Sequence, residues 1–224
     1  MKMLRLVSLA AAFSATAAIA ADDDVWDPLF KDDLSDADFP EGVWTVDDDG
    51  VLTASEDEAI WSQEEHANFE LKLEFKNAEG TNSGVIVYCS DTENWIPNSV
   101  EIQIADDHSE QWASQPKTWQ SGAIFGRLAP ERSAVKKPGE WNTMKVICHG
   151  PIITVVLNDD KVTEMDMRKW TDAKTNPDGS EIPSWLNKPL ATLPPKGHIG
   201  FQGKHAGAPI YFRNIQIRTL PAHD

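Results

Sequence analysis

The sequence has few cysteines and tyrosines, and it lacks several common catalytic signatures. Its 224 residues include two cysteines and two tyrosines against nine tryptophans. It has no Cys/His spacing for zinc, no glycine-rich loop for phosphate and no serine nucleophile elbow. These absences argue against a structural zinc protein, a nucleotide-binding P-loop enzyme and an α/β-hydrolase.

The two cysteines, Cys89 and Cys148, each lie in an apolar run typical of a strand. An exported protein could join them in a disulfide, whereas cysteines in such runs are often simply small buried side chains. The sequence cannot show whether their Cα atoms approach each other, so their pairing stays open.

Basic residues are also scarce. The chain has 20 Lys and Arg against 36 Asp and Glu, a formal net charge of −16. Nucleic acids and anionic membranes attract clustered Lys and Arg, so neither is an expected partner. The acidic balance is typical of a soluble exported protein with a neutral substrate.

Long apolar runs are absent except at the N-terminus. Lys2 and Arg5 precede an apolar stretch that ends in an Ala-Ile-Ala motif at Ala20. This pattern predicts a signal peptide over residues 1–20, cleaved after Ala20, and export to the periplasm or the medium. Residues 21–224 are then long enough to form one domain with a normal core.

Alternation of apolar and polar residues is the main structural signal. Residues 69–76 alternate without a break, which predicts an antiparallel strand with one solvated face. Further strands are expected over residues 84–89, 100–105, 122–127, 141–148, 152–157, 198–202 and 210–218, with turn sequences between them. Residues 156–162 resemble a hairpin. The whole pattern predicts an all-β antiparallel β-sandwich of the jelly-roll, concanavalin A-like type.

Two segments do not alternate. Residues 170–195 are rich in proline and predict a long loop packed over the sheet, held by burial of Trp185 and Leu186. Long loops on a rigid scaffold often carry binding or lid functions. The acidic segment 22–38 is expected to dock through its apolar side chains, Trp26, Leu29 and Phe30.

Residues 99–108 are the most informative stretch for function. Apolar residues alternate there with Glu101 and Gln103, so a strand would place this carboxylate and this amide on one face. The run ends in Asp106, Asp107 and His108, which can exchange protons or bind a cation. One interpretation is a polar site on the open face of a sheet, and the alternative is a half-exposed strand followed by an acidic turn.

The tryptophans permit two interpretations. Indole rings stack on the apolar faces of sugars while the ring N–H binds a hydroxyl, but they also anchor large loops. Trp112 and Trp119 are the best candidates for a sugar platform because they flank the end of the polar strand.

Seven short motifs, in order along the chain, together resemble one family. They are NSG at 82–84, EIQ at 101–103 with Asp106, SGAIF at 121–125 leading to AP at 129–130, KPGEWNT at 137–143, LN at 157–158, GHIGFQ at 197–202 and YFRNI at 211–215. This order and spacing resemble the 3-keto-disaccharide hydrolase domain family across essentially the whole chain after the signal peptide. The resemblance implies a concanavalin A-like sandwich.

It also implies cleavage of 3-keto-glycosides, by elimination or net hydrolysis. A ketone at C3 acidifies the C2 proton, and loss of that proton can expel the glycosidic oxygen from C1. The route needs a base for the C2 proton, a donor or cation for the enolate oxygen, and an acid for the leaving oxygen.

We therefore assign hypothetical roles within this sequence. The candidate catalytic residues are Glu101, His108 and Arg213: Glu101 or His108 would be the base, and Arg213 would stabilise an oxyanion or the sugar. Asp106 and His108 are candidate ligands of a divalent metal that would polarise the ketone. The candidate substrate-binding residues are Gln103, Trp112, Trp119, Gln202, His205 and Asn214.

Three other functions are consistent with such a sandwich, because a fold does not fix a function. A carbohydrate-binding module would use the same aromatic loops without catalysis. A metal-dependent glucanase would need two carboxylates on one strand, and the strand at 100–105 has only Glu101. A Ca²⁺-binding structural protein is indicated only by short acidic turns. The oligomeric state, the aglycone and the anomeric preference are not encoded in any visible motif.

Overall fold

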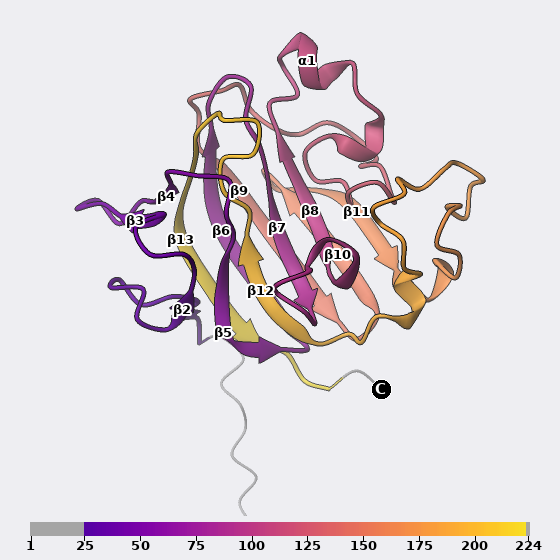
Figure 1. The fold of residues 1–224 in the computed structure, drawn as a ribbon, viewed down its shortest axis with the longest axis horizontal. Coiled ribbons are helices and arrows are strands. Elements are labelled where there is room, and N and C mark those ends of the chain that lie inside the picture. Colours follow the sequence, from indigo (N-terminus) through magenta and orange to yellow (C-terminus); the bar gives the residue numbers. More distant parts are fainter. Residues whose placement is uncertain (1–24, 223–224) are drawn as a thin grey trace, which may run out of the picture.

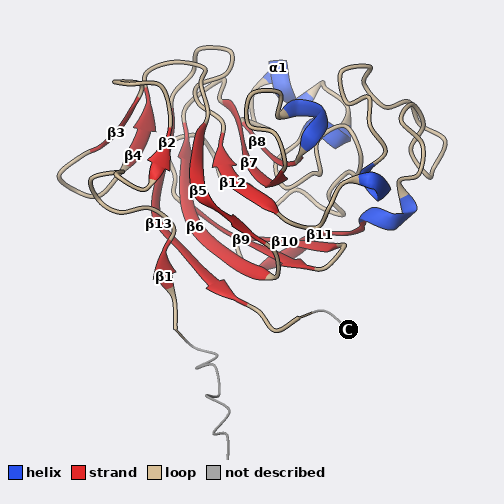
Figure 2. Cartoon of the chain, turned by 60° about the horizontal axis from the view of Figure 1, so that its bottom comes forward, coloured by secondary structure: helices blue, strands red, loops and turns tan. Residues whose placement is uncertain are grey.

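The computed structural model describes residues 25–222, whose strands form two antiparallel sheets packed face to face (Figures 1 and 2). This architecture confirms the predicted antiparallel β-sandwich. The predicted signal peptide lies outside the described residues. No helix within residues 25–222 is long and apolar enough to cross a membrane.

The larger sheet has eight strands. They are β1 (Asp27–Pro28), β3 (Trp44–Val46), β4 (Leu52–Ala54), β6 (Phe69–Asn77), β9 (Asn142–His149), β10 (Ile152–Leu157), β11 (Asp160–Asp166) and β13 (Ile210–Thr219). Their order is β11-β10-β9-β6-β13-β4-β3, and β1 pairs with β13. The hairpin predicted over residues 156–162 joins β10 to β11, with Asn158 and Asp159 at φ values of 50° and 70°. Positive φ at both central residues is the geometry of a type I′ turn.

The smaller sheet has five strands and carries the polar stretch identified in the sequence. Its strands are β2 (Ala37–Asp38), β5 (Ile60–His66), β7 (Asn82–Cys89), β8 (Val100–Ala105) and β12 (Gly197–Phe201). They lie in the order β2-β5-β12-β7-β8, so that β8 is an edge strand. Short helices lie in the connections: η1 (Ile96–Asn98), α1 (Glu110–Ala113), η2 (Lys117–Trp119), η3 (Met167–Lys169) and η4 (Leu190–Thr192).

The core lies between the sheets and explains the alternation. In β6 the apolar residues from Phe69 to Phe75 are buried, whereas Lys72 and Glu74 between them are partly exposed. In β8, Val100, Ile102 and Ile104 point into the core and are almost completely buried. Glu101 and Gln103 therefore belong to the outer face of the smaller sheet, because successive side chains of a strand point to opposite faces.

One predicted strand is wrong. Residues 122–127 form turns with isolated bridges rather than a strand. Gly122 and Gly126 have φ values of 84° and 66°, which bend the chain away from extended geometry. The segment still covers the exposed edge of β8, since the Phe125 N–H donates to the Glu101 carbonyl over 2.9 Å.

The two cysteines are free thiols. Cys89 lies in β7 of the smaller sheet and Cys148 in β9 of the larger sheet, and both are buried. Burial raises the pKa of the Cys89 thiol to about 11. Cys89 and Cys148 therefore form no disulfide and are two small, unreactive side chains of the core.

The docking of the N-terminal segment is confirmed, but one expectation for the long loop is wrong. Leu29 and Phe30 are buried, and the Trp26 ring lies 4.0 Å from the Lys72 ammonium. In the loop before β12, Leu186 is buried as expected, whereas Trp185 is 49% exposed. Leu186 packs against Gly126, so the neighbouring Trp185 ring is left on the outer side of the loop.

Candidate functional site

A cavity of about 350 Å³ lies on the outer face of the smaller sheet. Its floor comes from the adjacent strands β7 and β8 and from Gln202, which directly follows β12, and its walls come from loops. The residues that line it are Asn82, Trp95, Ile96, Glu101, Gln103, Trp112, Trp119, Phe125, Trp185, Gln202 and His205. The structure thus brings together six side chains selected from the sequence: Glu101, Gln103, Trp112, Trp119, Gln202 and His205.

Glu101 is the acidic group of this pocket. Its carboxylate lies directly over Gly84 of β7, where a Cβ atom would be only 2.5 Å from Oε1. No hydrogen bond joins the carboxylate to another side chain or main-chain group within residues 25–222. Burial in the pocket raises the pKa of Glu101 to about 8, and the negative charge of Asp57 adds to this effect. Among the described residues, Glu101 is therefore a carboxyl group without a hydrogen-bond partner, and it is mostly protonated at pH 7.

Three amide side chains lie beside it. Gln103 donates from Nε2 to Asn82 Oδ1 over 2.7 Å, across the β7–β8 pair. This bond fixes the orientation of the Gln103 amide. It uses only the oxygen of the Asn82 amide, so the Asn82 NH₂ group can still donate hydrogen bonds to a ligand. Gln202 follows β12 and is held through its main chain, whose N–H donates to the Gly84 carbonyl over 3.0 Å. The amides supply donors and acceptors suited to sugar hydroxyls.

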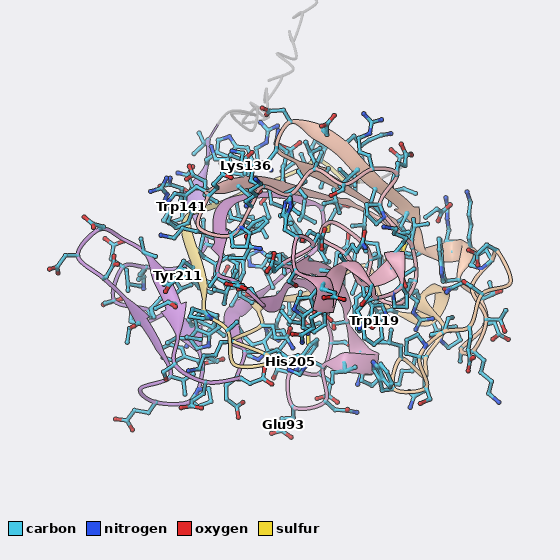
Figure 3. All side chains as sticks on the ribbon, turned by 90° about the horizontal axis from the view of Figure 1, so that it is seen from above. Glu93, Trp119, Lys136, Trp141, His205 and Tyr211 are labelled. Carbon is cyan, nitrogen blue, oxygen red and sulfur yellow. The ribbon has the colours of Figure 1, made fainter. Side chains whose placement is uncertain are left out.

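A histidine and an aspartate form a pair at the rim. His205 Nδ1 lies 2.6 Å from Asp57 Oδ2, and both side chains are about half exposed. Asp57 belongs to the loop between β4 and β5, and His205 belongs to the turn between β12 and β13. Figure 3 labels His205 on the same side of the molecule as Trp119.

Aromatic rings form the opposite wall. The Trp119 ring lies 5.2 Å from Phe125 and 6.2 Å from Trp185, measured between centroids, and meets Trp185 nearly edge to face. Trp95 packs in the same manner on Trp61, with centroids 6.2 Å apart. Trp112 is buried and its indole N–H donates to the Gly80 carbonyl. Trp112 is thus a structural part of the wall, whereas Trp119 and Trp185 present ring surface.

Arg127 stabilises the loop that carries Trp185 by hydrogen bonds to its main chain. This buried guanidinium donates from Nη2 to the carbonyls of Leu186 and Lys188, at 2.7 and 2.8 Å. Burial lowers the pKa of Arg127 to about 10, so it remains a cation at neutral pH. The long loop is consequently an ordered wall of the pocket, packed on residues that follow β8.

Asp106 and His108 do not join the pocket lining, contrary to expectation. The Asp106 carboxylate is buried and accepts hydrogen bonds from the main-chain N–H groups of Gly80 and His108. The His108 ring turns the other way, with Nε2 3.2 Å from the Val135 carbonyl. The chain reverses direction directly after β8, so these groups stabilise a turn instead of extending the polar row of the strand.

The proposed metal site is not supported by this arrangement. Within residues 25–222, no group of three or more His, Cys, Asp or Glu side chains is placed to hold a metal ion. Asp106 already binds two main-chain N–H groups, and His108 faces a carbonyl.

Arg213 and Asn214 lie on the other sheet, contrary to expectation. Both side chains bind Glu74 of β6, with Arg213 Nε at 2.7 Å and Asn214 Nδ2 at 3.0 Å from its carboxylate. The Arg213 guanidinium also stacks on Trp141, which Figure 3 labels well away from Trp119. A larger depression of about 510 Å³ includes Asn214, but no aromatic ring lines it.

Several pocket residues were not selected from the sequence. Asn82 and Phe125 are part of the motifs that carry the family resemblance, and Trp95 and Trp185 stand in loop-like surroundings. These signals could have identified them. Asp57, by contrast, stands in the acidic run 56–58 and has no feature that distinguishes it from a solvated turn.

The chain matches a known family over nearly its whole described length. The profile of the 3-keto-alpha-glucoside-1,2-lyase-like domain matches residues 25–218. A 3-keto-disaccharide hydrolase from Bacteroides thetaiotaomicron is 25% identical over 172 residues, covering 68% of this chain and 59% of that protein. The present chain therefore spans less than two thirds of the length of this relative.

Solved structures agree with the fold. A Parabacteroides distasonis protein, named provisionally as a glycosyl hydrolase, is 57% identical with a TM-score of 0.85; the match covers 88% of this chain and all of that one. A Bacillus subtilis protein of unknown function with a galectin-like fold is 14% identical with a TM-score of 0.54, over 89% of this chain and 96% of that one. The second likeness concerns the fold alone.

Proposed function

Because the chain belongs to the 3-keto-alpha-glucoside-1,2-lyase-like domain family, we propose that its pocket binds a 3-keto-glycoside and cleaves the glycosidic bond by elimination. Removal of the C2 proton gives an enolate next to the ketone. Collapse of this enolate forms a C1=C2 double bond and expels the glycosidic oxygen, which must receive a proton. Addition of water to the resulting glycal would complete a net hydrolysis.

The observation that carries this proposal is the state of Glu101. A carboxyl group without a hydrogen-bond partner, whose pKa is raised to about 8, is a proton donor at neutral pH. We therefore assign Glu101 as the acid that protonates the leaving oxygen. Burial that maintains a protonated carboxyl group is a common feature of general acids in glycoside cleavage.

The amide side chains complete the polar side of the pocket. The free donors of Asn82 and Gln202 suit the sugar hydroxyls and the enolate oxygen, where a fixed dipole stabilises developing charge. Gln103 would orient Asn82 through their hydrogen bond. On the other side, Trp119 and Trp185 suit the apolar face of a sugar ring or of the departing group.

Replacement of Trp185 by alanine should weaken substrate binding and leave the chemistry intact. Loss of one stacking ring is worth about 0.5–1.5 kcal/mol, so we expect KM to rise about 2–10-fold with little change in kcat. Stability should not change, because the ring is already 49% exposed. Steady-state kinetics would measure this, with Trp185→Phe as the control that retains a ring. An unchanged KM would remove Trp185 from the binding surface.

The pH dependence should follow the Glu101 proton. The acid form is required and the pKa of Glu101 is raised to about 8, so turnover should be present below pH 8. Above pH 8 it should fall about tenfold per unit, because the proton donor is lost. A pH profile of kcat between 6 and 10 tests this. A constant rate up to pH 10 would exclude Glu101 as the acid.

The activity itself can be tested by NMR. Purified protein would be incubated with 3-keto-trehalose and with a 3-keto-β-glucoside in D₂O, with and without EDTA and added divalent cations. Release of the aglycone or deuterium exchange at C2 would support the enzyme. Saturable binding without either reaction would instead indicate a carbohydrate-binding module. Loss of the reaction in EDTA would indicate that a metal takes part.

We also propose that the protein is exported, on the basis of the N-terminal sequence pattern. N-terminal sequencing of the protein purified from its native host should find Ala21 first, and a retained Met1 would contradict export through this signal.

A further inference from the structure

We propose that His205 is the base that removes the C2 proton, and that Asp57 is the positioning residue that holds its ring. This inference rests on the proposed function, and it supplies a role that neither Glu101 nor His108 fills. Glu101 is mostly protonated at neutral pH, and the His108 ring is turned toward a carbonyl outside the pocket. Of the described residues that line the pocket, only His205 carries an imidazole.

The contact between His205 and Asp57 decides which ring nitrogen is available. Nδ1 lies 2.6 Å from the Asp57 carboxylate, so Nδ1 is the nitrogen that donates a proton to it. The neutral ring then has its lone pair on Nε2, and no described group occupies that nitrogen. A carboxylate in this position also stabilises the imidazolium that forms when Nε2 accepts a proton.

Main-chain contacts hold the loop of Asp57 against the turn of His205. The contact between these two side chains is therefore supported by the backbone on both sides. Gly203 packs against the Glu56 carbonyl so closely that a Cβ atom would collide with it. The Lys204 N–H donates to the same carbonyl over 3.2 Å. His205 itself forms a β-bridge with Asn82 at the start of β7. These contacts fix His205 at the edge of the polar floor.

The carboxylate of Asp57 acts on both proton-transfer groups. It accepts the hydrogen bond that holds the His205 ring, and it also opposes ionisation of Glu101. A single carboxylate therefore orients the base and helps to keep the acid protonated. The two groups belong to one cavity but have opposite tasks.

Protons and electrons balance in the resulting cycle. His205 Nε2 takes the C2 proton, the C2–H electron pair forms the C1=C2 bond, and the C1–O bond breaks. Glu101 gives its proton to the leaving oxygen, so the alcohol departs while the 2-hydroxy-3-keto glycal stays in the pocket. In hydration, the Glu101 carboxylate takes a proton from water as the hydroxyl adds to C1, and the imidazolium returns its proton to C2. Both residues then regain their starting states.

The test follows C2 deuterium exchange and aglycone release from 3-keto-trehalose by NMR, in wild-type protein and in His205→Gln. We expect both rates to fall at least 100-fold in the variant, with unchanged folding because the side chain is half exposed. His198→Gln is the matched control, since this histidine lies in β12 and contacts the Ser62 carbonyl. Wild-type rates in His205→Gln would overturn the inference and leave the proposed function standing.

Asp57→Asn separates positioning from simple structural support. It should lower kcat about 10–100-fold with little change in KM, and Asp57→Glu should recover part of the loss. Nitrogen NMR of labelled protein should find the proton of His205 on Nδ1 in the wild type and a mixture of tautomers in Asp57→Asn. A wild-type proton on Nε2 would overturn the inference. A wild-type protein that neither exchanges nor cleaves 3-keto-glycosides would overturn the proposed function as well.

Discussion

Turnover of the 3-keto-glycoside should fall about 10²–10⁴-fold when Glu101 is replaced by glutamine. Glutamine preserves the shape of the side chain over Gly84 but cannot give a proton to the leaving oxygen. KM should change little, because the amide can still contact a sugar oxygen. Measurement of kcat with purified Glu101→Gln checks this, and a variant with wild-type kcat would remove Glu101 from the chemistry.

The same variant should be more stable than the wild type at alkaline pH. In the unfolded chain Glu101 ionises near pH 4.5, whereas in the pocket its pKa is raised to about 8. The folded state therefore binds more protons between these values, and wild-type stability falls as pH rises from about 4.5 to 8. Glutamine does not titrate, so its advantage should grow to about 4–5 kcal/mol at pH 8–9, at about 1.4 kcal/mol per pKa unit. Thermal unfolding at pH 5 and pH 9 measures the difference, and an equal gap at both pH values would contradict the raised pKa.

The second large effect is expected from Gly84→Ala. The added Cβ would lie 2.5 Å from Glu101 Oε1 and 2.8 Å from its Cγ, so the carboxyl group must move. Displacement of a reacting group by about 1 Å costs on the order of 100-fold in rate, and we expect kcat to fall by that amount. Stability should change by only about 1 kcal/mol, because the group that moves is the end of a flexible side chain.

A double-variant cycle identifies the cause of this loss. If Gly84→Ala acts through Glu101, the combination of Gly84→Ala with Glu101→Gln should be no less active than Glu101→Gln alone. Multiplication of the two losses would instead mean that the methyl group disturbs substrate binding directly. Such a result would contradict the role given to the space above Gly84.

The strands that the sequence predicted are those with one buried face. In β6 and β8 one face meets the core and the other does not, so apolar and polar residues alternate. β5 was missed because its first three residues are all buried and the next three are exposed. The apolar residues between Gly122 and Gly126 predict a strand over residues 122–127, but both glycines have positive φ and bend the chain.

The part of the candidate site that could be predicted from the sequence is the part that depends on one strand, β8. The phase of β8 fixes Glu101 and Gln103 on the same outer face, and the nearby loops supply Trp119 and His205. The sequence does not show to which sheet a later strand belongs, so Arg213 of β13 was placed in the wrong layer. Nor does it show that a loop after β4 meets a turn after β12, which is how Asp57 reaches His205.

The division of the pocket between strands and loops has a consequence for the evolution of specificity. Glu101, Gln103 and Asn82 stand on hydrogen-bonded strands, and Gln202 directly follows one. The three tryptophans Trp95, Trp119 and Trp185 stand on connections. Connections tolerate insertion and replacement far better than paired strands do. A lineage of such proteins could therefore exchange the group that it accepts beyond the sugar while Glu101 and the amides beside it are inherited unaltered. Grafting residues 183–188 between relatives would be the simplest way to move a preference for a leaving group from one protein to another.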